Sequence, residues 1–152
     1  MSSQQIRTLL EQIVREIGDS VYISAEDKDI ESFFEWTRKV LPELRSNLSG
    51  YIEFSKIADG LSFNGLYIYS IVPRSENNIY DSNEEWWDNE RQKRYLFFAD
   101  DSISWYCLEI SSGVFYVLDK PSGERMEHFQ SFDELICRAL EAVLCDEDDD
   151  ED

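Results

Sequence analysis

The sequence predicts an α+β domain in which a mainly antiparallel sheet of about four or more strands is wrapped by N-terminal and C-terminal helices. Three observations lead to this fold class. Apolar residues recur at helical spacing over residues 3–58, form short runs rich in aromatic and β-branched side chains over residues 65–118, and return to helical spacing after residue 131. At 152 residues, the chain has the length of one domain, which we place at residues 1–145.

Two amphipathic helices are expected at the N-terminal end. The first begins near Ser3 and ends before Gly18, a residue suited to a left-handed helix cap. The second begins after Ser24, whose hydroxyl can cap it. It ends before Pro42, because a proline disfavours helical geometry in the residue that precedes it.

Two longer helical patterns flank the predicted sheet. One follows Pro42 and ends at Gly60, and Gly50 weakens its middle by about 1 kcal/mol relative to alanine. The other begins at Ser131, because Ser131 and Glu134 form an S-x-x-E capping box ahead of an apolar stripe. These helices are expected to cover the sheet.

Four strands are expected, at residues 65–72, 94–99, 103–110 and 113–118. Short polar breaks separate the last three, so these read as an antiparallel meander. The Lys-Pro-Ser-Gly sequence at 120–123 suits a type I turn that leads the chain off the sheet. Between the first strand and the meander, residues 84–91 are expected to form a short helix.

Charge excludes two classes of partner. Acidic residues outnumber basic residues by 33 to 14, and the formal net charge is −19. A surface this acidic repels nucleic-acid phosphates and anionic lipid headgroups, so neither nucleic acid nor a membrane is expected as a partner. Residues 146–152 are all acidic and are expected to form a solvated, disordered tail.

The cysteines and the N-terminal residues indicate a cytoplasmic protein. Three cysteines occur without metal-ligand spacing, and we expect them to be reduced. The first residues lack the basic start and apolar run of a secretory signal, and no stretch reaches the roughly 20 apolar residues that span a bilayer.

No catalytic residue, cofactor or metal site is expected. His128 is the only histidine, and Cys107 and Cys137 lie in apolar segments that favour a neutral thiol. Motifs for a serine nucleophile or a phosphate-binding loop are absent. Asp100 and Asp101 occupy a turn between strands, which is the ordinary structural position of such residues.

Trp86 and Trp87 admit two interpretations. Neighbours on a helix point about 100° apart, so both rings are hard to bury in one narrow seam. In the first interpretation one ring packs in the core and the other covers a loop. In the second, one ring is an exposed contact residue surrounded by carboxylates.

Several motifs together resemble the SUKH superfamily, and its YrhA-like branch in particular. The resemblance covers roughly residues 26–145. It rests on Leu-Pro at 41–42, Asn-Gly at 64–65, Trp-Trp-Asp-Asn-Glu at 86–90, Phe-Phe-Ala-Asp-Asp at 97–101 and Leu-Asp-Lys-Pro-Ser-Gly at 118–123. Two features depart from the family pattern: Ala-Asp-Gly at 58–60, and the acidic tail.

The resemblance implies a helix-wrapped antiparallel sheet and a role as an immunity protein that neutralises a bacterial toxin by binding it. A basic protein, such as a toxin domain, is then the expected partner, because opposite charge accelerates association. The alternative is a regulatory or small-molecule-binding module unrelated to toxins; the oligomeric state stays open in both. The residues expected to contact the partner are Glu84, Glu85, Trp86, Trp87, Asp88, Glu90, Asp100 and Asp101.

Overall fold

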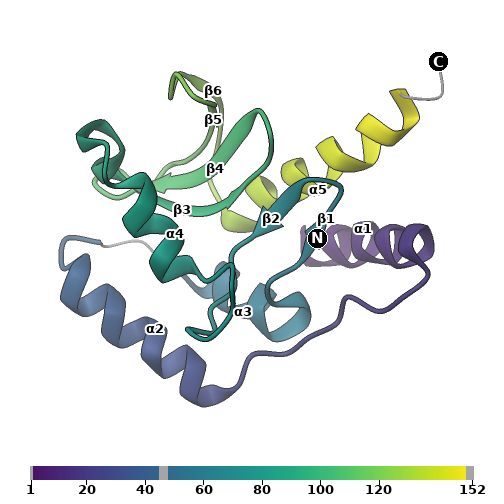
Figure 1. The fold of residues 1–152 in the computed structure, drawn as a ribbon, viewed down its shortest axis with the longest axis horizontal. Helices are drawn as coiled ribbons and strands as arrows, with labels where there is room; N and C mark the ends of the chain where they lie inside the picture. The colour runs from purple at the N-terminus through teal and green to yellow at the C-terminus, as the bar shows by residue number, and fades with distance from the viewer. Residues whose placement is uncertain (1, 45–47, 150–152) are drawn as a thin grey trace.

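The computed structural model describes residues 2–44 and 48–149. Within them, a six-stranded antiparallel sheet in the order β1-β2-β3-β4-β5-β6 is flanked by the N-terminal and C-terminal helices, which confirms the α+β class (Figure 1). The helices are α1 (Ser2–Ile17), α2 (Asp27–Val40), α3 (Ser49–Ala58), α4 (Ile79–Trp86), the 3₁₀ helix η1 (Glu90–Arg94) and α5 (Phe132–Asp149). The strands are β1 (Ser62–Phe63), β2 (Leu66–Ile68), β3 (Tyr95–Asp100), β4 (Ser104–Glu109), β5 (Phe115–Asp119) and β6 (Arg125–Phe129).

Strand β3 carries apolar side chains on both faces because helices cover the sheet centre from both sides. Successive residues of a strand point to opposite faces. Phe98 packs on α5, with its ring centroid 5.1 Å from that of Phe132. Phe97 points to the other face, where its ring lies 6.5 Å from that of Trp86 at the end of α4. Helix α1 packs against α5, and the two lie side by side in Figure 1.

The segment after β5 differs from the prediction. Residues 120–123 do not lead the chain off the sheet; they connect β5 to β6, and Gly123 N donates to the carbonyl of Asp119 at 2.7 Å. The Lys120–Pro121 peptide bond is cis. Strand β6 was missed because its sequence, Arg-Met-Glu-His-Phe, lacks apolar alternation, and this strand forms through its pairing with β5.

Helix α2 and the helix expected over residues 84–91 also differ from the prediction, whereas the start of α5 agrees with it. Helix α2 is capped by Glu26, whose N–H donates to Asp29 Oδ2 at 3.4 Å, rather than by Ser24. The helix expected over 84–91 is divided between the end of α4 and η1. Helix α5 begins with the predicted cap, since Glu134 N donates to Ser131 Oγ at 3.2 Å.

Helix α5 continues through Asp149, past the boundary placed at residue 145. The predicted acidic tail is therefore helical in its first four residues, 146–149, and its remainder, 150–152, lies outside the described residues. Within the described part of the chain, none of the helices has the length and apolar character needed to cross a membrane.

Candidate protein-binding face

Helix α4 is fixed at both ends by asparagine side chains. Asn78 caps its first turn, with Asn78 Oδ1 accepting from Asp81 N at 2.7 Å. Asn83 is fully buried; its Nδ2 donates to the carbonyls of Ile79 and Phe97, and its Oδ1 accepts from Phe97 N at 2.7 Å. These bonds join α4 to β3, so α4 presents its outer face from a rigid support.

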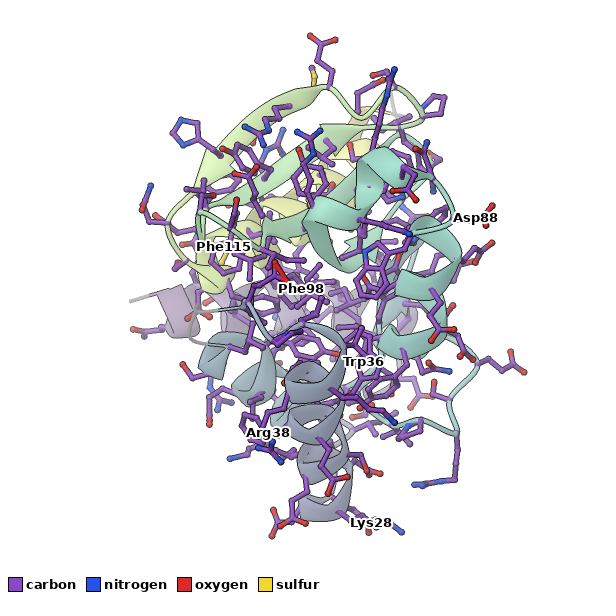
Figure 2. All side chains as sticks on the ribbon, turned by 90° about the vertical axis from the view of Figure 1, so that its left-hand side faces the viewer. Lys28, Trp36, Arg38, Asp88, Phe98 and Phe115 are labelled. Carbon is purple, nitrogen blue, oxygen red and sulfur yellow. The ribbon has the colours of Figure 1, made fainter. Side chains whose placement is uncertain are left out.

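Four of the predicted contact residues, Glu84, Glu85, Asp88 and Glu90, are exposed along the outside of α4 and the start of η1. We call this set the acidic ridge. Among the described residues, Glu90 is its one member with an ion pair, to Lys93 at 3.1 Å. Because both partners of that pair are well exposed, the pair contributes little to stability. Figure 2 shows Asp88 at the outer edge of the molecule.

Trp87 packs under the ridge against α2. Its indole ring is half-buried and stacks on Trp36, with the ring centroids 5.9 Å apart and the planes inclined by 4°. Its Nε1 donates to the carbonyl of Tyr95 at 2.7 Å. The ring therefore covers the junction between α2 and β3.

Trp86 belongs to a polar network on the sheet. Its Nε1 donates to the Tyr69 hydroxyl at 2.9 Å, and this hydroxyl donates to Asp100 Oδ1 at 2.6 Å. Asp100 also forms an ion pair with Lys120, whose Nζ lies 5.2 Å from the Trp86 ring centroid. Burial raises the pKa of the Tyr69 hydroxyl well above its usual range, so this hydroxyl remains a proton donor.

The Asp101 carboxylate accepts hydrogen bonds from residues of its own turn and from β4. Its Oδ1 accepts from the backbone N–H groups of Ile103 and Ser104, at 3.0 and 2.8 Å. Its Oδ2 accepts from the Tyr106 hydroxyl at 2.8 Å. The structure therefore separates the predicted residues into the exposed acidic ridge, two half-buried tryptophans and two aspartates committed to internal bonds.

The sequence pattern did not indicate the role of Lys120. It donates to Asp100 and to the carbonyl of Asp101, and so closes the network from β5. Lys120 is distant from both aspartates in the sequence. Only the antiparallel pairing of Ser104 with Asp119 brings it to this turn.

Cys107 has the properties of a core residue. Burial raises the pKa of its thiol well above the usual range, and its Sγ contacts the carbonyl of Tyr116 at 3.7 Å. A neutral thiol is a poor nucleophile.

His128 is exposed on β6 and is separated from β4, the strand of Cys107, by β5. Among the residues that the structure describes, no group of three or more His, Cys, Asp or Glu side chains could hold a metal ion.

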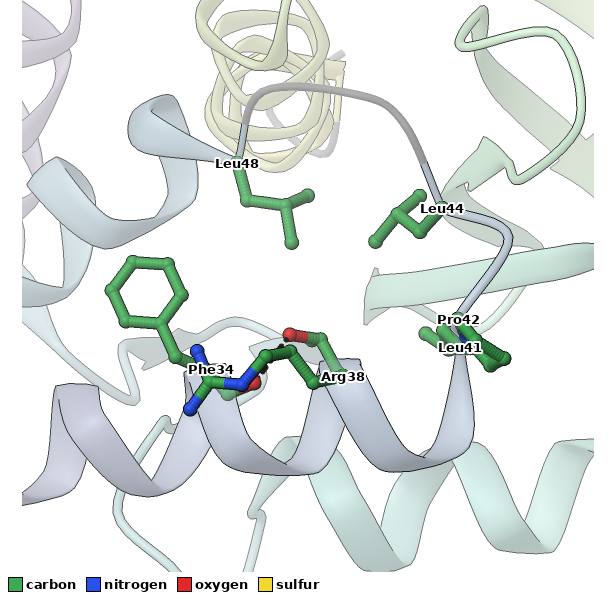
Figure 3. A pocket seen from close by; sticks show the side chains of 7 residues that line it. Phe34, Arg38, Leu41, Pro42, Leu44 and Leu48 are labelled. Carbon is green, nitrogen blue, oxygen red and sulfur yellow. Dashed lines mark hydrogen bonds between the residues drawn. The ribbon is translucent and has the colours of Figure 1, made fainter.

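A hollow of about 500 Å³ lies at the C-terminal end of α2. Figure 3 shows Leu44 and Leu48 facing α2 across it, with Phe34 and Arg38 on the opposite wall. Leu44 and Leu48 are on either side of residues 45–47, which lie outside the described residues. We therefore assign no ligand to this hollow.

Comparison with known proteins gives a likeness of fold. No family model matches the chain, and a search of curated proteins found no match. A crystal structure of a protein from Pseudomonas syringae pv. tomato is similar, with a TM-score of 0.56 at 17% sequence identity. The match covers 84% of this chain and 92% of the Pseudomonas chain.

Proposed function

We propose that this chain is a non-enzymatic protein-binding module of the cytoplasm, and that it acts as an immunity protein that neutralises a basic toxin by binding it. The observation that carries the proposal is the acidic ridge. Its four carboxylates are exposed along α4 and the start of η1, α4 is hydrogen-bonded to the sheet, and among the described residues Glu90 is the one ridge member in an ion pair. A rigid, uncompensated row of charges attracts a cationic surface at long range.

The tryptophans beneath the ridge supply the apolar part of the proposed interface. Charge complementarity mainly raises the association rate, whereas tight binding needs buried aromatic contacts. Trp86 and Trp87 are both half-buried and lie next to the ridge residues in the sequence. The resemblance to the SUKH superfamily supports the same proposal, because immunity to a toxin is the expected role of its bacterial members.

The test compares two variants with the same loss of charge. One carries Glu84→Gln, Glu85→Gln and Asp88→Asn on the ridge. The control carries Glu11→Gln, Glu16→Gln and Asp19→Asn, which alter exposed acids at α1 and the turn after it. The amides keep the acceptor atoms that Tyr22 OH and Ser20 N use on Glu11 and Asp19.

The wild-type chain is first used to purify its partner from the cells that encode it, and the partner is then produced alone in a bacterial host. We expect growth arrest, rescue by the wild type and by the α1 control, and loss of rescue with the ridge variant. A partner whose production is harmless would refute the immunity role. Equal rescue by the two variants would refute the ridge as the contact surface.

A further inference from the structure

A second hollow, of about 340 Å³, lies between η1 and the β5–β6 turn, and its lining is basic or uncharged although the chain as a whole is acidic. It is lined by Asn89, Arg91, Gln92, Arg94, Tyr95, Pro121, Ser122 and Gly123. None of these lining residues is acidic, on a chain with 33 acidic residues. Its volume lies within the range of about 300–1,000 Å³ that is usual for small-molecule sites.

The two arginines of this hollow have no carboxylate partner. Among the described residues, Lys93, which lies between them in the sequence, pairs with Glu90, but neither Arg91 nor Arg94 forms an ion pair. Arg94 lies over the Tyr95 ring at 5.9 Å, which fixes its position without neutralising its charge. Two guanidinium groups without an ion pair thus border one small space, and the carboxylate of Glu109 is a more distant electrostatic neighbour of Arg94.

Gln92 adds a neutral hydrogen-bonding group to the lining of the hollow. The residue is 9% exposed and lines the hollow, yet its side-chain amide forms no hydrogen bond with any described residue. The buried side-chain polar atoms without a partner in the described part of the chain are Ser55 Oγ and Trp105 Nε1, so the Gln92 amide is accessible to solvent and to a ligand. Its amide N–H group therefore adds a donor to those of the arginines.

We propose that this hollow binds the phosphate group of a small phosphate monoester. Guanidinium groups pair with phosphate in a bidentate geometry, and a phosphate monoester has three terminal oxygens to share among several donors. One arginine alone satisfies both oxygens of a carboxylate, so two arginines and an amide fit phosphate better. The carboxylates nearest in sequence on the turn are Asp119, which accepts from Ser122 Oγ, and the exposed Glu124.

This site adjoins the acidic ridge at Glu90 but is lined by none of the ridge residues, so the inference does not rest on the proposed function. It is tested by titrating the ¹⁵N-labelled full chain with inorganic phosphate, and in parallel with acetate, at constant pH and ionic strength. We expect phosphate to produce saturable amide shifts confined to residues 89–95 and 121–123. Absence of such shifts would overturn the proposal, and equal affinity for acetate would overturn the choice of phosphate.

A pair of matched variants assigns the binding to the arginines. Arg91→Gln with Arg94→Gln is expected to weaken phosphate binding by at least about tenfold. Arg7→Gln with Arg15→Gln removes the same charge from exposed positions of α1 and should leave the affinity unchanged. Gln92→Leu removes only the amide and should also weaken binding, which keeps the test valid if the double arginine variant fails to fold. Equal binding by all variants would overturn the assignment.

Discussion

Asn83 is the residue on which the position of α4 depends most directly. Two of its three hydrogen bonds satisfy the N–H and the carbonyl of Phe97 in the middle of the sheet, and the third goes to the carbonyl of Ile79. We expect Asn83→Ala to lower the free energy of unfolding by about 3 kcal/mol, because it leaves buried backbone groups without partners. Urea denaturation measures the change. Asn77→Ala, whose side chain forms no hydrogen bond in the described structure, should change stability by less than about 0.5 kcal/mol.

Asp59 makes the free energy of unfolding depend on pH, and the direction of this dependence follows from the burial of its carboxyl group. Burial raises the pKa of this carboxyl above its ordinary value, although Ser70 Oγ and Ile71 N donate to it. The folded state therefore binds the proton more tightly than the unfolded state. The resulting stabilisation is present below the unfolded pKa and is lost as pH rises through the folded pKa.

We therefore expect the free energy of unfolding of Asp59→Asn, relative to that of the wild type, to be higher near pH 7 than at about pH 4. Urea denaturation at both pH values measures it. The amide retains an acceptor for Ile71 N and a donor toward Ser70. The exposed Asp27→Asn provides the control for general acid effects. A stability difference between Asp59→Asn and the wild type that does not change with pH would contradict the assignment.

At the scale of elements, Gly50 explains how closely α3 approaches α5. The sequence indicated only that glycine weakens this helix. In the structure, a Cβ added at Gly50 would lie 2.8 Å from the Cβ of Phe132, closer than two carbons can pack. We expect Gly50→Ala to lower the free energy of unfolding by about 1–3 kcal/mol through overpacking, despite the better helix propensity of alanine. In the same chemical denaturation series, Glu53→Ala at an exposed position of α3 should leave the free energy of unfolding nearly unchanged. An increase in the free energy of unfolding for Gly50→Ala would show that α3 and α5 can move apart without cost.

The elements differ in how far local sequence determines them. The cap at Ser131 and the apolar run of β3 were predicted correctly, because both depend on neighbouring residues. Strand β6 and the position of Lys120 depend on pairing between segments, which no local pattern encodes. The basic residues of η1 were visible in the sequence as Arg-Gln-Lys-Arg at 91–94, but the hollow they line requires the β5–β6 turn beside them.

At the scale of the whole molecule, the net charge led to the expected class of partner, but the sequence did not predict which acidic side chains remain unpaired at the surface. The exposure of Glu84, Glu85, Asp88 and Glu90 agrees with the polar side of the predicted helix. Asp100 and Asp101 were grouped with them because all are acidic, and the structure uses these two to hold Lys120 and a turn. The composition gives the number of charged residues, whereas the fold determines which of these residues remain exposed and unpaired.

The net charge of −19 predicts opposite responses of folding and binding to salt. Like charges repel across the folded surface, and raising the ionic strength from about 0.01 to 0.15 M shortens the screening length from about 30 to 8 Å. We expect the Tm to rise by about 3 °C over this range, measured by circular dichroism. The same screening weakens attraction to a cationic partner, so the association rate should fall while the Tm rises. In the triple ridge variant, the association rate should lose most of its salt dependence, because the three removed charges are a large part of the proposed contact. The Tm should keep most of its salt dependence, because the same three charges are a small part of the total repulsion. A Tm that falls with salt would contradict the expected effect on folding, and an association rate that does not change with salt would contradict the expected effect on binding.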